Sequence, residues 1–224
     1  MQHHAVDERH ALSETLRCAD PDSETLCGDW TTAQLAAHLV LRERSVVELA
    51  GRLPVRRLRE HAEQMILDLA TREPYEKLVD LVHRGPSWSD LSWPLPVAWL
   101  WSLPPVREAT NLLEYLVHHE DVRRARRGWA PRSLPPDVQD AVWQRLRLAA
   151  RLTLRSVPVG IALRWPGPGE LRTRLAGRGA PTVTITGDPV ELAMFTFGRL
   201  GVAQVDYAGD PADIAAVRGA DISI

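Results

Sequence analysis

The stretch NLLEYLVHHEDVRRA, residues 111–125, predicts one of the long helices of a helical bundle. Apolar side chains cover most of its circumference. Glu114, His118 and Asp121 share the remaining arc, because residues three and four apart lie on one face of a helix. This arc allows two interpretations. A carboxylate and an imidazole one turn apart can bind a single cation, or they can form a helix-stabilising pair in contact with solvent.

A second helix of this kind is predicted upstream, in TTAQLAAHLVLRERSVVELA, residues 31–50. Thr31 and Gln34 have the spacing of a capping box, which marks the start of a helix. His38 falls within the apolar arc, so its ring nitrogens need partners in a protein core. A structural core histidine and a metal ligand both satisfy that need. Arg42 follows His38 by one turn and lies on the same arc.

The two helices together could bring three ligands to one cation, namely His38, Glu114 and His118. Three protein ligands leave a fourth coordination position open, which is typical of catalytic zinc rather than structural zinc. A core histidine beside a solvated Glu–His pair remains the alternative. His119 projects from another side of its helix and is a weaker candidate. Cys27 precedes the second helix, where backbone N–H groups could activate a thiol, but a structural or incidental role is favoured.

The remainder of the first 157 residues also predicts helices. Apolar periodicity and breaks at Pro and Gly place them at about residues 5–18, 56–71, 75–84, 106–127 and 135–156. Amphipathic helices with short connections favour an antiparallel four-helix bundle. The stretch 85–105 interrupts the pattern, because it is rich in both Trp and Pro. It is either an ordered loop that closes one end of the bundle or an apolar lid over a ligand cleft.

After Pro158 the sequence changes to short β-rich runs separated by Gly and Pro. We expect strands in VGIALRWPG, ELRTRLAGRG and PTVTITGD, then a helix in PVELAMFTFGRL, a strand in VAQVDYAGD and a last helix. This order predicts a small α+β domain over residues 158–224, after a helical bundle over residues 1–157. The expected fold class is therefore α+β, mainly α.

The composition excludes several classes of protein. The 27 basic and 29 acidic side chains give a formal charge of −2, which is too even for a sequence-independent nucleic-acid binder or for attraction to an anionic membrane. Two cysteines cannot build a disulfide scaffold, and no apolar run is long enough to cross a bilayer. The polar N-terminus is unlike a signal peptide. We therefore expect a cytoplasmic protein with neither nucleic acid nor membrane as a partner.

Three stretches resemble a known family. TLCGDWTTAQLAAHLVLRER, residues 25–44, resembles the first signature of the DinB-like metal-binding superfamily, and ATNLLEYLVHHEDVRRA, residues 109–125, resembles the second, Glu-x-x-x-His-x-x-Asp. Residues 181–209 are similar to the sterol-carrier-protein-like C-terminal domain of mycothiol-dependent maleylpyruvate isomerases. The resemblance spans nearly the whole chain in the expected order. It is strongest to a branch of that family with TLCxGW and LAAHLVxRER motifs.

The resemblance assigns roles to individual residues. The positions that match the family's metal ligands are His38, Glu114 and His118. Asp121 matches the acidic position of the same helix and would support the ligands from behind. For Arg42 the spacing to His38, and not the resemblance, predicts a supporting role, because a neighbouring guanidinium disfavours protonation of the imidazole and so suits a neutral metal ligand. The pair Gly198-Arg199 matches the end of the family's C-terminal helix pattern, which predicts that Arg199 binds substrate.

The resemblance also implies a chemistry. The family activates a low-molecular-weight thiol, mycothiol or a relative, on a divalent metal, here expected to be zinc, and the thiolate is the nucleophile. This implies a thiol-dependent transferase or isomerase that acts on a small molecule; a homodimer is compatible with the sequence. The alternatives are metal-assisted hydrolysis and a non-catalytic metal-binding sensor of a ligand. The Trp/Pro-rich stretch 85–105 departs from the isomerase, which argues against maleylpyruvate as the substrate.

Overall fold

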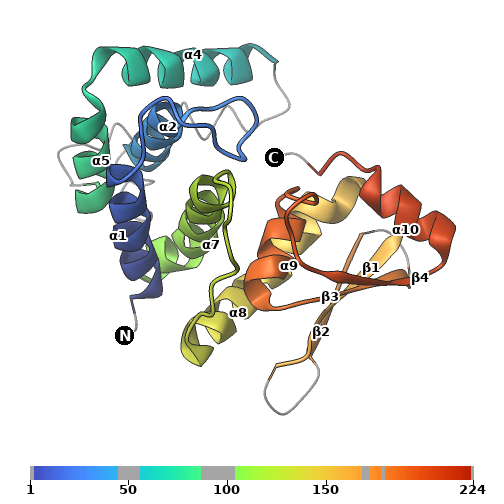
Figure 1. Ribbon diagram of the computed structural model, residues 1–224. Helices are drawn as coiled ribbons and strands as arrows, with labels where there is room; N and C mark the ends of the chain where they lie inside the picture. The colour runs from blue at the N-terminus through green and yellow to red at the C-terminus, as the bar shows by residue number, and fades with distance from the viewer. Residues whose placement is uncertain (1–2, 45–55, 87–103, 168–171, 178–179, 223–224) are drawn as a thin grey trace. The chain divides into compact units, whose positions relative to one another are not determined.

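The structure, a computed structural model, describes residues 3–44, 56–86, 104–167, 172–177 and 180–222. The chain forms two compact units, Met1–Ala130 and Pro131–Ile224 (Figure 1). The first is helical and the second combines helices with a small sheet. The predicted class, α+β and mainly α, is confirmed. None of the helices in the described ranges is both long and apolar enough to cross a membrane.

The described helices of the first unit are α1 (His4–Arg17), α2 (Thr32–Arg44), α4 (Arg56–Arg72), α5 (Tyr75–Arg84) and α7 (Pro104–Arg124). Helix α1 packs against α7 and α5, and α2 packs against α4 and α5. The first, third and fourth of these helices match the predicted ranges to within one residue at each end. The part of the predicted second helix that follows Arg44 lies outside the described residues.

Helix α7 is the core of the first unit. Every side chain from Asn111 to Val122 is buried, so this segment is packed on all sides. Its apolar residues, such as Leu112 and Leu116, are fully buried. The polar residues of the same segment are buried as well, and each therefore needs a polar partner. Tyr115 finds one in Glu43 of α2, to which its hydroxyl donates a hydrogen bond. Burial and the Glu43 carboxylate both raise the pKa of Tyr115, which keeps the phenol neutral and able to donate.

The start of α2 confirms the predicted capping box. The Thr31 N–H donates to Gln34 Oε1 at 2.9 Å, and the Gln34 N–H donates to Thr31 Oγ1 at 3.4 Å. These two bonds satisfy N–H groups that have no partner within the helix. An isolated antiparallel bridge between Glu24 and Thr31 closes the loop that precedes the helix. This loop, residues 24–31, therefore has a defined shape.

The same loop meets the C-terminal end of α7. The Leu26 N–H donates to the backbone carbonyl of Asp121 at 3.2 Å. The last four carbonyl groups of a helix accept no hydrogen bond from the helix itself. The Asp121 carbonyl is one of these four, because α7 ends at Arg124. The loop thus supplies a cap for α7 as well as leading into α2.

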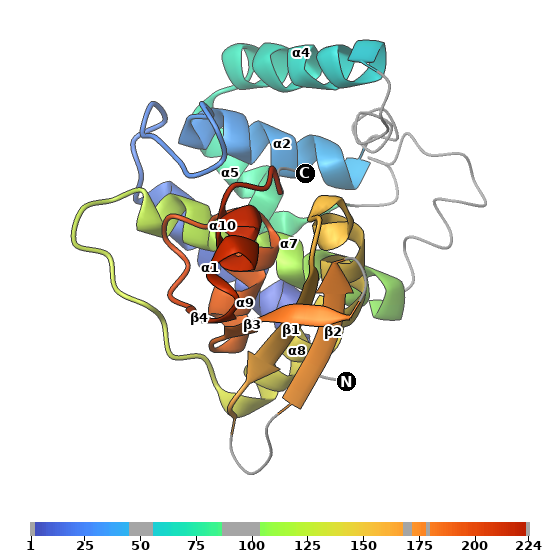
Figure 2. The ribbon, with the colours of Figure 1, turned by 90° about the vertical axis from the view of Figure 1, so that its right-hand side faces the viewer.

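The second unit contains a four-stranded sheet of order β2-β1-β3-β4. Its elements are α8 (Pro136–Thr153), β1 (Gly160–Trp165), β2 (Arg172–Gly177), β3 (Pro181–Thr186), α9 (Pro189–Thr196), β4 (Asp206–Gly209) and α10 (Pro211–Arg218). Strands β1 and β3 are parallel, and the two outer pairs are antiparallel. Helices α8 and α9 pack together beside the sheet (Figure 2). Trp143 of α8 contacts Trp165 of β1, with ring centroids 5.8 Å apart.

The predicted boundary near residue 157 coincides with the change from helices to strands, but the second compact unit begins earlier, at Pro131. The reason is α8, which packs against α9 and β2. The sequence pattern shows that α8 is amphipathic, and it does not show which partner covers the apolar face.

Removal of the capping box tests this account of α2. Thr31→Ala should lower the free energy of unfolding by about 1 kcal/mol, because the Gln34 N–H loses its acceptor. Urea unfolding followed by circular dichroism measures the change. The control is Thr71→Ala in α4, where the exposed hydroxyl bonds only back to the Leu67 carbonyl of its own helix; it should change stability by less than about 0.5 kcal/mol. Equal losses in both variants would contradict the assignment.

Candidate metal centre

The structure brings His38, Glu114 and His118 together. Glu114 Oε1 lies 3.3 Å from His38 Nε2 and 3.3 Å from His118 Nε2. One ligand atom from each residue lies within 4.8 Å of the other two. His38 is 5% exposed, and Glu114 and His118 are each 7% exposed. The interpretation of Glu114 and His118 as a solvated pair therefore does not hold, because both are buried.

Asp121 fixes the orientation of His118. Asp121 Oδ2 lies 3.0 Å from His118 Nδ1, and Glu114 approaches the other ring nitrogen, Nε2. A carboxylate on one imidazole nitrogen holds the proton there and directs the second nitrogen to a metal. Burial lowers the pKa of His118, but the hydrogen bonds with Asp121 and Glu114 outweigh it, and the net pKa is raised. Two carboxylates thus favour positive charge at this ring, whether a proton or a metal ion supplies it.

Arg42 supports Glu114. Arg42 Nε lies 3.0 Å from Glu114 Oε1, and Arg42 Nη1 donates to Asn111 Oδ1 at 2.7 Å. A buried carboxylate is costly unless opposite charge or hydrogen bonds compensate it. The Arg42 guanidinium provides that charge, and Asn111 holds the guanidinium in place. The sequence placed Arg42 on the arc of His38. The structure shows that Arg42 also pairs with the Glu114 carboxylate of α7.

The donor set fits a divalent transition metal. Two imidazole nitrogens and one carboxylate oxygen form the His₂Glu combination of several catalytic zinc sites. Three such ligands leave one position of a tetrahedral ion for a further ligand. The residues behind the donors, Asp121 and Arg42, orient one imidazole and balance the carboxylate. Metal binding by this set remains a prediction, which the arrangement of the side chains supports.

His119, the weaker candidate, faces a different helix. Its Nδ1 lies 2.7 Å from Glu8 Oε1, and its Nε2 lies 2.8 Å from Thr15 Oγ1, both on α1. Both ring nitrogens therefore have partners. His119 is 4% exposed, and its contacts join α1 to α7.

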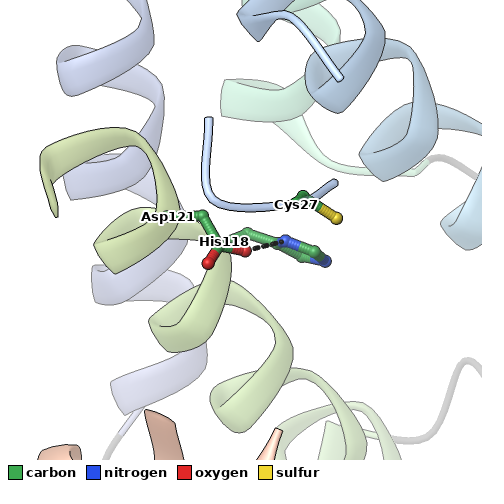
Figure 3. A group of neighbouring side chains, drawn as sticks. All are labelled: Cys27, His118 and Asp121. Atoms are coloured by element: carbon green, nitrogen blue, oxygen red, sulfur yellow. Dashed lines mark hydrogen bonds and ion pairs between the residues drawn. The ribbon is translucent and has the colours of Figure 1, made fainter. Parts of the chain in front are cut away.

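Two residues of the loop that precedes α2 lie beside the candidate ligands. The ring of Trp30 lies 5.0 Å from the ring of His38. Cys27 lies near His118 and Asp121, and one ligand atom from each of these three residues lies within 4.8 Å of the other two (Figure 3). The sequence favoured a structural or incidental role for Cys27. No residue spacing could have shown its proximity to α7, because a loop and a helix about 90 positions apart have no common periodicity.

One further predicted site residue belongs to the second unit. Arg199 follows α9 in the second unit and donates a hydrogen bond from Nη1 to the Phe197 carbonyl at 2.6 Å; its role in substrate binding remains a prediction. Within the Trp/Pro-rich stretch 85–105, residues 87–103 lie outside the described residues, and both interpretations of that stretch remain predictions.

Comparison with known proteins bears on the fold. No family model matches the sequence, and no curated protein matches it. Two solved structures match, the crystal structure of the mycothiol-dependent maleylpyruvate isomerase and that of a histidine-to-alanine mutant of it. The chain has the fold of that isomerase. In each match the TM-score is 0.58 and the sequence identity 17%, over 92% of this chain and 91% of the other. The resemblance stated from the sequence is thus confirmed for the fold.

Loss of a ligand tests the candidate centre. His38→Ala and the larger His38→Gln should both weaken zinc binding by more than the roughly 10- to 100-fold that is typical when a supporting residue is removed. Isothermal titration of the metal-free protein with zinc measures the affinity. His61→Ala, at an exposed position of α4, is the matched control and should bind zinc like the parent protein. Unchanged affinity in both His38 variants would rule out this centre.

Asp121→Asn tests the support of His118. The variant keeps the size of the side chain but removes the charge that holds the proton on His118 Nδ1. Zinc affinity should fall about 10- to 100-fold, while the thermal midpoint of the metal-free protein should move much less than that of a variant with a core cavity. An affinity equal to that of the parent protein would show that Asp121 has no part in metal binding.

Proposed function

We propose that this chain is a divalent-metal-dependent enzyme that activates a low-molecular-weight thiol for transfer to, or isomerisation of, a small molecule. The observation that carries the proposal is the buried group of His38, Glu114 and His118, supported by Asp121 and Arg42. The fold adds to it, because the isomerase with the same fold is named as mycothiol-dependent. Mycothiol or a related thiol is accordingly the proposed co-substrate.

The charges around the donors suit this chemistry. A divalent cation supplies a Lewis acid that lowers the pKa of a bound thiol toward neutrality. The two imidazoles are neutral ligands, and the negative charge of Glu114 is balanced by Arg42. Asp121, 3.0 Å from His118 Nδ1, adds one further negative charge, so about half of the charge of a divalent cation would remain to attract an anionic fourth ligand such as a thiolate.

The donor set also supports zinc as the metal. Zinc binds nitrogen, oxygen and sulfur donors in tetrahedral geometry, and it does not change oxidation state in the presence of a thiol. The proposed surroundings of the protein agree with this chemistry. A reduced thiol pool is a property of the cytoplasm, and we propose that the protein acts there on small molecules, without nucleic acid or membrane as a partner.

Dependence on thiol is the decisive test. The zinc-loaded protein is incubated with a panel of small electrophiles, among them activated aryl halides and cis-enoates, with and without mycothiol. We expect turnover that requires the thiol, is lost in His38→Ala and is kept in His61→Ala.

Other outcomes would contradict the proposal in distinct ways. Turnover without thiol, with water as the nucleophile, would indicate a hydrolase. Binding of zinc and small molecules without any turnover would indicate a non-catalytic sensor. A parent protein that binds zinc no better than His38→Ala would remove the basis of the proposal.

A further inference from the structure

The two candidate imidazole ligands have different neighbours. Asp121 Oδ2 lies 3.0 Å from His118 Nδ1, the contact marked in Figure 3, so a carboxylate acts on the plane of that ring. The ring of His38 contacts two other rings. Its centroid lies 5.0 Å from that of Trp30, at an interplanar angle of 45°, and 5.2 Å from that of His118, at 72°. Both separations lie in the range of favourable aromatic pairs, about 4.5 to 7 Å. Aromatic neighbours therefore act on the plane of His38.

The plane of an imidazole decides whether its nitrogen can reach a metal, because the lone pair of the nitrogen lies in that plane. The torsion that turns a histidine ring about its Cβ–Cγ bond has only a broad preference of its own. Neighbouring groups must therefore fix the ring of a ligand. His38 Nε2 lies 3.3 Å from Glu114 Oε1, so the ring already directs this nitrogen toward the other donors. A neighbour that limits rotation of the ring thus favours metal binding.

The loop that precedes α2 holds Trp30 in place. The Trp30 N–H donates to the Cys27 carbonyl at 3.2 Å, and Thr25 Oγ1 donates to the Trp30 carbonyl at 2.8 Å. Both backbone polar groups of Trp30 are thus engaged within the loop. The next residue, Thr31, takes part in the capping box of α2. The backbone of Trp30 is therefore fixed with respect to the helix that carries His38.

We infer that Trp30 is a positioning residue of the metal centre, whose ring holds the plane of His38 as Asp121 holds that of His118. This inference rests on the proposed function, since it needs the ion held by His38, Glu114 and His118. A tryptophan ring suits the task, because it is large, rigid and has only two side-chain torsions. The two imidazoles are then supported in different ways, one by a carboxylate and the other by an aromatic contact.

The expected effect depends on the fraction of molecules in which the His38 ring has the orientation that a metal requires. The apparent affinity for the metal is the intrinsic affinity multiplied by that fraction. Loss of a residue that supports a metal ligand typically lowers the affinity about 10- to 100-fold. An aromatic contact leaves a ring more freedom than a hydrogen bond to a carboxylate does. We therefore expect Trp30 to contribute at the lower end of this range, about tenfold.

A purely structural role for Trp30 would have a different requirement. An apolar residue just before the N-cap of a helix often packs against the fourth residue of the helix, which here is Leu35. Leu35 is fully buried. An apolar side chain of any shape can make such a contact, whereas only a flat ring can hold the plane of His38. The two roles therefore differ in whether position 30 needs an aromatic ring.

Substitutions of Trp30 separate these roles. Trp30→Leu and Trp30→Met keep an apolar side chain without a ring, and Trp30→Phe keeps a flat ring. Isothermal titration of the metal-free proteins with zinc should show binding about tenfold weaker for Trp30→Leu and Trp30→Met, and binding close to that of the parent protein for Trp30→Phe. Trp129→Leu is the matched control and should bind zinc like the parent protein. Trp129 is also half-buried in the first unit, but its ring contacts the Arg124 guanidinium.

A double-mutant cycle tests whether Trp30 acts through His38. In the His38→Ala background, Trp30→Leu should change the remaining affinity for zinc less than about twofold, because no ring is left to be held. A residue that supports the centre as a whole would instead lower the affinity about tenfold in both backgrounds. That result would overturn the role assigned to Trp30.

The failures of the two proposals are distinguishable. Zinc binding that requires His38 but is unchanged in Trp30→Leu and Trp30→Met would overturn the role of Trp30 and leave the centre of His38, Glu114 and His118 intact. Equal losses of affinity in Trp30→Leu and Trp30→Phe would do the same. A parent protein that binds zinc no better than His38→Ala would overturn both proposals at once.

Discussion

The buried carboxylate of Glu114 is the constraint on which the first unit depends. A carboxylate that is 7% exposed must be compensated, and an uncompensated one would cost several kcal/mol. Its partners are Arg42 and His38 on α2 and His118 one turn along α7. These contacts fix both the spacing of the two helices and their register, since a slide of one residue would separate the partners. The Tyr115–Glu43 bond lies beside them and joins the same pair of helices. Polar side-chain pairs, surrounded by apolar residues, therefore determine how α2 and α7 align.

The sequence predicted the parts of the fold that depend on local pattern. The capping box of Thr31 and Gln34 located the start of α2, and the prolines at 74 and 135 located the starts of α5 and α8. Spacing also placed Glu114 and His118 on one face. Spacing alone could not decide whether that face contacts solvent or lies in the core. In the structure α7 buries this polar arc together with its apolar circumference. That question was settled only by the partner helix, which contributes Arg42 and His38.

Other features were beyond the sequence for a different reason. Helix α8 belongs to the second unit because its apolar face packs against α9 and β2. The sequence shows that this face is apolar, but an apolar face by itself does not identify the element that covers it. The proximity of Cys27 to His118 involves a backbone bond from Leu26 of the loop to Asp121 of α7, and a contact between a loop and a distant helix has no signature in the sequence pattern. The adjacent histidines are an intermediate case. Spacing placed His119 on another side of its helix from His118, but only the structure shows the partners, His38 of α2 beside His118 and Glu8 of α1 beside His119.

Asp121 has two tasks, and their combination has a thermodynamic consequence. Its side chain orients His118, and its backbone carbonyl accepts the bond from Leu26 that fixes the loop of residues 24–31. Order in this loop and occupancy of the metal centre are thus linked through one residue. The coupling is reciprocal: if a bound metal stabilises the ordered loop by a certain free energy, order in the loop strengthens metal binding by the same free energy. Exchange of the Leu26 amide proton with solvent should therefore slow when the metal binds, and its rate would report on a metal that this amide does not touch.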